Sequence, residues 1–186
     1  MGKNAENQAL LHKKAHVETH ILYGKGPVDV WEEKVFLEKN SCSHWINIRH
    51  PGAVAILPID HKGNVLLVEQ WRRGVGEITL EVPAGFIDPK EEPLAAAQRE
   101  LQEETGYKAG RWMALGGCYT SPSLSNEYIH LFLALALEES ILIAEDTHQI
   151  DKEWVSLSTA LQLIEKGKIT DAKTILLLLR YSRGKE

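Results

Sequence analysis

The sequence predicts a mixed α and β fold of the α+β class. Short runs rich in β-branched and aromatic residues alternate with turn residues, longer segments have helical spacing, and there is no internal repeat or low-complexity tract. With 186 residues, 44% of them hydrophobic and 25% charged, the chain can bury a core of ordinary size. We therefore expect one main domain with an appendage.

The first fifty residues are expected to form the appendage, a small antiparallel β subdomain. Strand-like runs occupy residues 16–23, 28–37 and 43–48, and the turns GKGP and EKNS separate them. Residues 1–50 are accordingly assigned to an N-terminal subdomain and residues 51–186 to the main domain.

The main domain is expected to begin after His50-Pro51-Gly52. Its first feature is a hairpin signature, in which two apolar strands are joined by the turn His61-Lys62-Gly63. A helix is expected between Pro93, which suits a first helical turn, and Gly106, which suits a helix end. The expected strands are 53–60, 64–71, 78–82, 112–119 and 128–137, and the expected helices are 94–105, 158–166 and 172–181.

Composition argues against several classes of partner. The formal net charge of -5 gives no general attraction to phosphate backbones, so a nucleic-acid partner is not expected. The apolar runs 131–137 and 175–180 are much shorter than the roughly 20 residues of a membrane helix, and the start of the chain lacks a secretory apolar stretch. Cys42 and Cys118 are too few for a disulfide scaffold, so a cytoplasmic location is expected.

The decisive segment is residues 85–107, GFIDPKEEPLAAAQRELQEETGY. Its glycines, Glu91, the run Arg99-Glu100-Leu101 and the pair Glu103-Glu104 resemble the Nudix box, the loop–helix–loop signature of the Nudix hydrolases, at every fixed position. Only Tyr107 departs, because a smaller aliphatic residue is usual there. The resemblance implies the Nudix fold, a mixed β-sheet sandwiched between helices, and hydrolysis with Mg²⁺, for which Mn²⁺ can substitute.

The spacing of the three box carboxylates supports this interpretation independently. On a helix, Glu100, Glu103 and Glu104 share one face, with Cβ atoms about 5–6 Å apart. Such crowding suits a site for hard divalent cations, which prefer carboxylate oxygen. A glutamate-rich helix face is more often solvated surface, but the glycines and Glu91 in register favour the functional interpretation. The family pattern also implies an ion pair between Arg99 and Glu91.

Flanking segments resemble the subfamily that cleaves ADP-ribose. LEVPAG at residues 80–85 implies that the carbonyl of Ala84 is a metal ligand, and EQWRRG at residues 69–74 implies that Arg72 clamps a substrate phosphate. The alternative is that Arg72 merely solubilises a loop. Pro122 stands fifteen residues after Tyr107, an offset typical of this group, and the following Ser123 replaces its usual glycine.

Three further roles follow from the resemblance. Glu127 is a candidate for a metal or sugar contact, or an ordinary loop carboxylate. The general base is expected within residues 144–154, where Glu145 or Asp146 is favoured over His148. The N-terminal subdomain is expected to build a homodimer, in which Trp31 either stacks on a nucleobase of the partner's substrate or is buried in the interface.

The expected activity is hydrolysis of the pyrophosphate of a nucleoside diphosphate sugar, with ADP-ribose the first candidate and GDP-mannose and others as alternatives. An RNA-cap or dinucleoside-polyphosphate hydrolase, or a sensor that binds ADP-ribose without cleaving it, are the competing functions. The expected sites are catalytic Glu103, Glu104, Glu127, Glu145 and Asp146; substrate-binding Trp31, Arg49, Arg72 and Glu81; and metal-binding Ala84, Glu100, Glu103 and Glu104.

Overall fold

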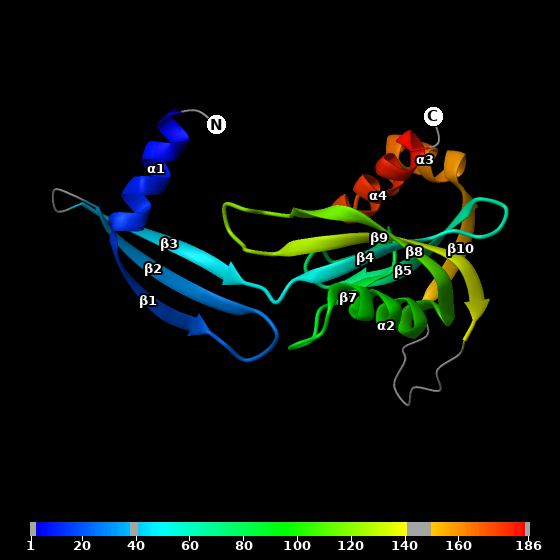
Figure 1. Cartoon of the computed structure of the whole chain (residues 1–186), viewed down its shortest axis with the longest axis horizontal. Coiled ribbons are helices and arrows are strands. Elements are labelled where there is room, and N and C mark those ends of the chain that lie inside the picture. The colour runs from blue at the N-terminus through cyan, green and yellow to red at the C-terminus, as the bar shows by residue number, and fades with distance from the viewer. Residues whose placement is uncertain (1–2, 38–40, 141–149, 185–186) are drawn as a thin grey trace. The chain divides into compact units, whose positions relative to one another are not determined.

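The computed structural model describes residues 3–37, 41–140 and 150–184 (Figure 1). The chain divides into two compact units. One consists of Met1–Pro51 and the loop Ser121–Glu127, and the other of Gly52–Thr120 and Tyr128–Glu186. Each unit is described by itself.

The first unit carries an antiparallel three-stranded sheet of order β1-β2-β3, with the strands β1 His16–Tyr23, β2 Asp29–Leu37 and β3 Ser41–Arg49. These strands confirm the three runs predicted near the N-terminus. A helix that we did not predict, α1 Lys3–Lys14, precedes them. None of the residues of α1 is buried, so the helix does not need an apolar stripe in its sequence. The only sequence signal for α1 is its content of residues with high intrinsic helix propensity.

The loop Ser121–Glu127 is hydrogen-bonded to the end of β3. The amide of Ile48 donates to the carbonyl of Leu124 at 2.8 Å. The side chain of Asn126 accepts from the amide of His50 at 2.7 Å and donates to the carbonyl of His50 at 3.1 Å. This loop therefore belongs to the first unit although it lies far from it in sequence.

The second unit contains two sheets. A four-stranded sheet has the order β7-β4-β9-β8 and a three-stranded sheet the order β10-β5-β6. Strands β4 and β9 are parallel, whereas the other pairs in this unit are antiparallel. The strands are β4 Ala53–Pro58, β5 Asn64–Arg72, β6 Glu77–Glu81, β7 Ala84–Phe86, β8 Tyr107–Tyr119, β9 Tyr128–Glu139 and β10 Asp151–Ser156.

Three helices cover the two sides of these sheets, as the second unit in Figure 1 shows. They are α2 Pro93–Thr105, α3 Leu157–Glu165 and α4 Ala172–Arg183. Alternate residues of β4 point to opposite faces: Val54 and Ile56 pack in the cluster that contains buried residues of α2, and Ala55 and Leu57 pack in the cluster that contains α4. The α+β class with a mixed arrangement of strands between helices is confirmed.

The strands differ from the prediction in four places, one of which is the three-residue strand β7, which was not predicted. The predicted hairpin after residue 52 is reduced to a single bridge between Ile59 and Val65, because β4 and β5 pair with other strands in separate sheets. Strand β10 was not predicted, since its sequence DKEWVS is largely polar. Strand β8 begins at Tyr107 instead of residue 112. No helix among the described residues has the length and apolar character to cross a membrane.

Candidate active site on helix α2

Helix α2 is fixed in place by its ends and by one buried side. Pro93 occupies the first turn, and Gly106 ends the helix in the left-handed conformation with φ 71°. Ala96, Ala97 and Leu101, on the side of the helix that packs in the core, are fully buried. This packing fixes the rotation of α2 and leaves Glu103 exposed, whereas Glu100 and Glu104 are partly buried.

Gly85 on β7 allows the carboxylate of Glu100 to approach the strand closely. A Cβ atom at Gly85 would stand 2.0 Å from Cδ of Glu100, so only glycine leaves room for the carboxylate in this position. The side chain of Glu100 is 13% exposed. Burial raises its pKa, and hydrogen bonding to Arg99 only partly offsets that effect.

The side chain of Glu104, on helix α2, is hydrogen-bonded to residues of two strands, β7 and β5. One carboxylate oxygen accepts from the amide of Ala84 at 2.9 Å, and the other accepts from Nε2 of Gln70 on β5 at 2.6 Å. Burial raises the pKa of Glu104 to about 7, although both hydrogen bonds act in the opposite direction. The charge of neighbouring Glu100 raises it further.

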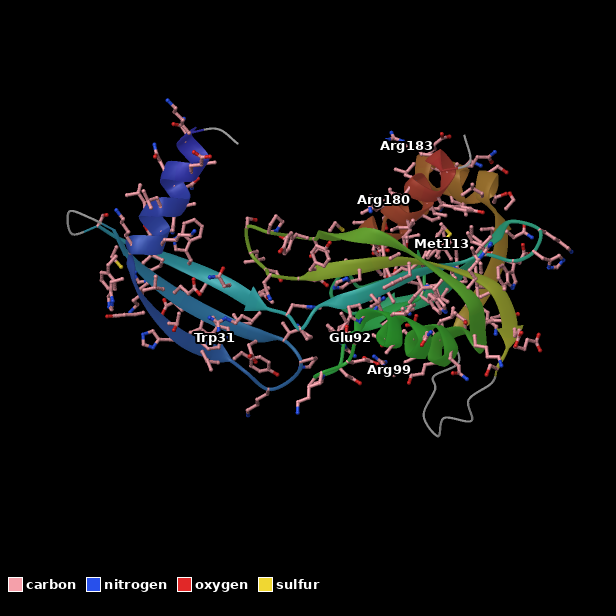
Figure 2. The ribbon with its side chains drawn as sticks, viewed as in Figure 1. Trp31, Glu92, Arg99, Met113, Arg180 and Arg183 are labelled. Carbon is pink, nitrogen blue, oxygen red and sulfur yellow. The ribbon has the colours of Figure 1, made fainter. Side chains whose placement is uncertain are left out.

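The predicted ion pair between Arg99 and Glu91 is confirmed. Nε and Nη2 of Arg99 donate to the two oxygens of Glu91 at 3.1 and 2.9 Å, and Nη2 also donates to the carbonyl of Phe86 at 2.9 Å. Nη1 donates to Glu100 at 2.6 Å and to Glu103 at 3.3 Å. Arg99, labelled on α2 in Figure 2, thus links the loop before the helix to two of the box carboxylates.

The box carboxylates have the donor chemistry that a divalent cation requires. As they lie, no three acidic, histidine or cysteine side chains within the described ranges form a group that could hold a metal. Arg99 engages Glu100 and Glu103, and Gln70 engages Glu104. Burial nevertheless raises the pKa of Glu100 and Glu104, so both carboxylates would hold their negative charge more readily with a cation beside them. The donor set therefore fits a hard divalent ion.

Arg72 and Glu81, both predicted to bind substrate, are paired with each other. Nε and Nη2 of Arg72 donate to the two oxygens of Glu81 at 2.8 and 2.7 Å. Burial alone would raise the pKa of Glu81, but Arg72, Lys173 and the hydroxyl of Thr79 outweigh burial and lower it to about 2. Glu81 is therefore ionised at neutral pH, and it orients Arg72.

Trp31 and Arg49 lie together in the first unit. The guanidinium carbon of Arg49 is 3.6 Å from the centre of the Trp31 ring, a stacked cation–π arrangement. Trp31 is labelled on β2 in Figure 2. Its Nε1 is buried and has no hydrogen-bond partner among the described residues. A buried tryptophan usually finds such a partner.

The remaining predicted residues lie outside the second unit or outside the described residues. Glu127 belongs to the first unit, where one of its carboxylate oxygens lies 3.3 Å from Nε2 of His50. Glu145, Asp146 and His148 lie outside the described residues. The predicted roles of all four stay predictions.

Two contacts at this site were not found from the sequence. Gln70 bonds to Glu104, and Lys173 bonds to Glu81. Gln70 is part of the EQWRRG segment, so that segment could have indicated the contact with Glu104. No local sequence pattern indicates the contact of Lys173 with Glu81. A separate cavity of about 550 Å³ lies between the β4–β5 turn and strands β8 to β10, but none of the predicted site residues lines it.

The comparisons with known proteins agree with this geometry. The NUDIX domain family matches residues 49–178, more than half of the chain, so the chain belongs to the NUDIX domain family. An ADP-ribose pyrophosphatase of Bacillus subtilis is 35% identical over 182 residues, which cover 95% of each chain. A methanol dehydrogenase activator of Bacillus methanolicus is 32% identical over 168 residues, 89% of this chain and 91% of the relative.

A solved structure described as an ADP compounds hydrolase has the same fold. It superimposes with a TM-score of 0.80 over 92% of this chain and 96% of its own, at 21% sequence identity. This likeness confirms the Nudix fold. Members of the family generally need divalent metal ions.

Proposed function

We propose that the protein hydrolyses the central pyrophosphate of nucleoside diphosphate sugars, with ADP-ribose as its preferred substrate. The observation that carries the proposal is the set of three carboxylates on α2, of which Glu100 packs against β7 at Gly85 and Glu104 accepts from the amide of Ala84. The likeness to the B. subtilis ADP-ribose pyrophosphatase over almost the whole chain supports the choice of substrate.

Mg²⁺ is the proposed cofactor, held by Glu100, Glu103, Glu104 and the carbonyl of Ala84, and Mn²⁺ is expected to substitute for it. The cation supplies charge neutralisation at the pyrophosphate and an activated water. The protein's part is to place the carboxylates: the Arg99–Glu91 pair fixes the loop before α2, and the Ala84 amide fixes Glu104.

Arg72 is the proposed phosphate contact. Its planar guanidinium suits a phosphate, and the pair with Glu81 holds it in one orientation. Trp31 and Arg49 are the proposed contacts for the nucleobase, supported by their stacked arrangement. Glu127 is proposed as a metal or sugar contact, and Glu145 or Asp146 as the general base.

A homodimer that uses the N-terminal subdomain, residues 1–50, is also proposed, with catalysis assigned to residues 51–186. Ile21 and Leu22 lie where the pairing of β1 with β2 shifts register, and they are 58% and 56% exposed. Trp45 and Ile46 are neighbours on the regularly paired part of β3, so they point to opposite faces of the sheet, and they are 46% and 45% exposed. A three-stranded sheet with large apolar side chains exposed on both faces favours coverage by a second subunit.

Further aspects of the proposal concern location and partners. Cys42 and Cys118 form no disulfide, which is consistent with a cytoplasmic location. The net charge of -5 supports the absence of a nucleic-acid partner. An ADP-ribose sensor without activity is disfavoured because all three box carboxylates are present.

A substrate panel tests the proposed function. The purified protein is incubated with Mg²⁺ and ADP-ribose, GDP-mannose, UDP-glucose, NADH, a dinucleoside polyphosphate or capped RNA, and the products are separated. The proposal expects the highest kcat/KM for ADP-ribose, with AMP and ribose 5-phosphate as products. A preference for capped RNA or for dinucleoside polyphosphates would replace it with the competing hydrolase function, and binding of ADP-ribose without turnover would indicate the sensor.

A further inference from the structure

Glu81 is a buried carboxylate on which several donors converge. It is 2% exposed. One oxygen accepts from Nε of Arg72 and from the hydroxyl of Thr79 at 2.5 Å, and the other accepts from Nη2 of Arg72 and from Nζ of Lys173. Arg72 on β5 and Lys173 on α4 therefore both donate to the carboxylate of Glu81. Loss of either cation would leave the orientation of this carboxylate less restricted.

Lys173 comes from the first turn of α4, which is itself anchored to the end of β6. Asp171 caps α4 by accepting from the amide of Thr174 at 2.9 Å, and it also accepts from Nζ of Lys173 at 2.9 Å. The hydroxyl of Thr174 accepts from the amide of Val82 at 2.8 Å. The side chain of Lys173 is only 13% exposed, so its ammonium group has little freedom to leave Glu81.

Arg72 retains donors after it has bound Glu81. Its Nε and Nη2 are used, whereas no side chain or carbonyl among the described residues accepts from Nη1. The side chain is 39% exposed. A phosphate oxygen can therefore bind Arg72 without breaking its bonds to Glu81, provided that the carboxylate keeps its orientation.

We propose that Lys173 is a positioning residue, which holds Glu81 and through it keeps Arg72 oriented toward a phosphate of the substrate. The inference rests on the proposed function, because it takes Arg72 to be a phosphate contact. Without Lys173, one oxygen of Glu81 loses its second donor. The carboxylate can then turn toward Nη1 of Arg72 and compete with the phosphate for that group.

A double-mutant cycle in the full-length protein tests this role. The variants are Lys173→Met, Arg72→Gln and the double variant, with Lys168→Met as a matched control on an exposed lysine nearby. The readout is the Kd for the non-hydrolysable α,β-methylene analogue of ADP-ribose, measured by calorimetry. Circular dichroism and thermal melts check folding, and Lys173→Gln, which keeps a hydrogen-bond donor without the charge, is measured alongside.

We expect Lys173→Met to weaken binding about tenfold in the parent and less than about twofold in the Arg72→Gln background. Lys173 acts through Arg72 in this proposal, so the effects of the two substitutions on binding should not be additive. Lys168→Met should leave binding unchanged. An equal loss in both backgrounds, or no loss in the parent, would overturn the positioning role. If Arg72→Gln itself has no effect, the inference also fails, whereas failure of the parent to hydrolyse any nucleoside diphosphate sugar would instead sink the proposed function.

Discussion

The carboxyl carbon of Glu100 lies 2.0 Å from the point where a Cβ atom on Gly85 would stand. This relationship joins strand β7 to helix α2 at the proposed metal site. It gives a physical reason for the first glycine of the box: the carboxylate occupies the space that any larger residue would fill.

Gly85→Ala should therefore displace the Glu100 carboxylate without unfolding the protein, because the atom in the way is the end of a flexible side chain. We expect the Mg²⁺ concentration for half-maximal activity to rise roughly 10–100-fold. A metal titration of activity measures this. Gly74→Ala is the control, since a Cβ there meets nothing within 4 Å, and similar titrations for both variants would contradict the account.

Glu104→Gln should lower kcat on the order of 100-fold or more, because it removes one of the proposed metal ligands. The fold should survive, since the substituted side chain can still accept from the amide of Ala84. Steady-state kinetics with ADP-ribose and a thermal melt check both statements. Glu92→Gln, an exposed carboxylate at the helix start, is the control. Activity of Glu104→Gln within about threefold of the parent would rule out the metal role.

Glu81 should make stability depend on pH in the acid range. Its pKa is lowered from 4.5 to about 2 in the folded protein. The unfolded state thus binds the proton more readily, and the stability from Glu81 is present above about pH 4.5 and lost as the pH falls through 2. At most about 3 kcal/mol is involved. Denaturant unfolding of the parent and of Glu81→Gln should show a stability difference that shrinks from pH 5 to 2; a constant difference would refute it.

The proposed dimer should depend on the exposed apolar residues of β1. Changing Ile21 and Leu22 together to glutamate would place two charges in the interface, so the protein should sediment as a monomer and bind ADP-ribose more weakly. Met113→Glu is the matched control, because Met113 is 49% exposed on β8 of the second unit and is labelled in Figure 2. An unchanged sedimentation mass in the Ile21 and Leu22 variant would count against this interface.

The sequence was sufficient for the parts of the fold and site that depend on local pattern. The signals at Pro93 and Gly106 predicted helix α2, because helix ends depend on residues within one short segment. The Arg99–Glu91 pair was implied by the resemblance to the Nudix box. Alternating apolar runs predicted most strands. Helix α1 was missed because it buries nothing, and β10 because a polar edge strand has little hydrophobic signal.

The contacts between distant segments could not be predicted in this way. Lys173 reaches Glu81 across 92 residues of sequence, and no rule of spacing connects a helix start to a strand end so far away. The same holds for the loop that carries Glu127, which bonds to the end of β3 in the first unit. Such pairings follow from packing of the whole chain, which a single sequence does not display.

The point of bond cleavage tests the central claim most directly. ADP-ribose is incubated with the protein and Mg²⁺ in ¹⁸O-labelled water, and the two products are weighed by mass spectrometry. The account predicts AMP and ribose 5-phosphate, with the label on the phosphate group of one of them, because water attacks a phosphorus of the pyrophosphate. Release of intact ADP together with unphosphorylated ribose would contradict it, because the phosphoester of the ribose and not the pyrophosphate would then have been cut.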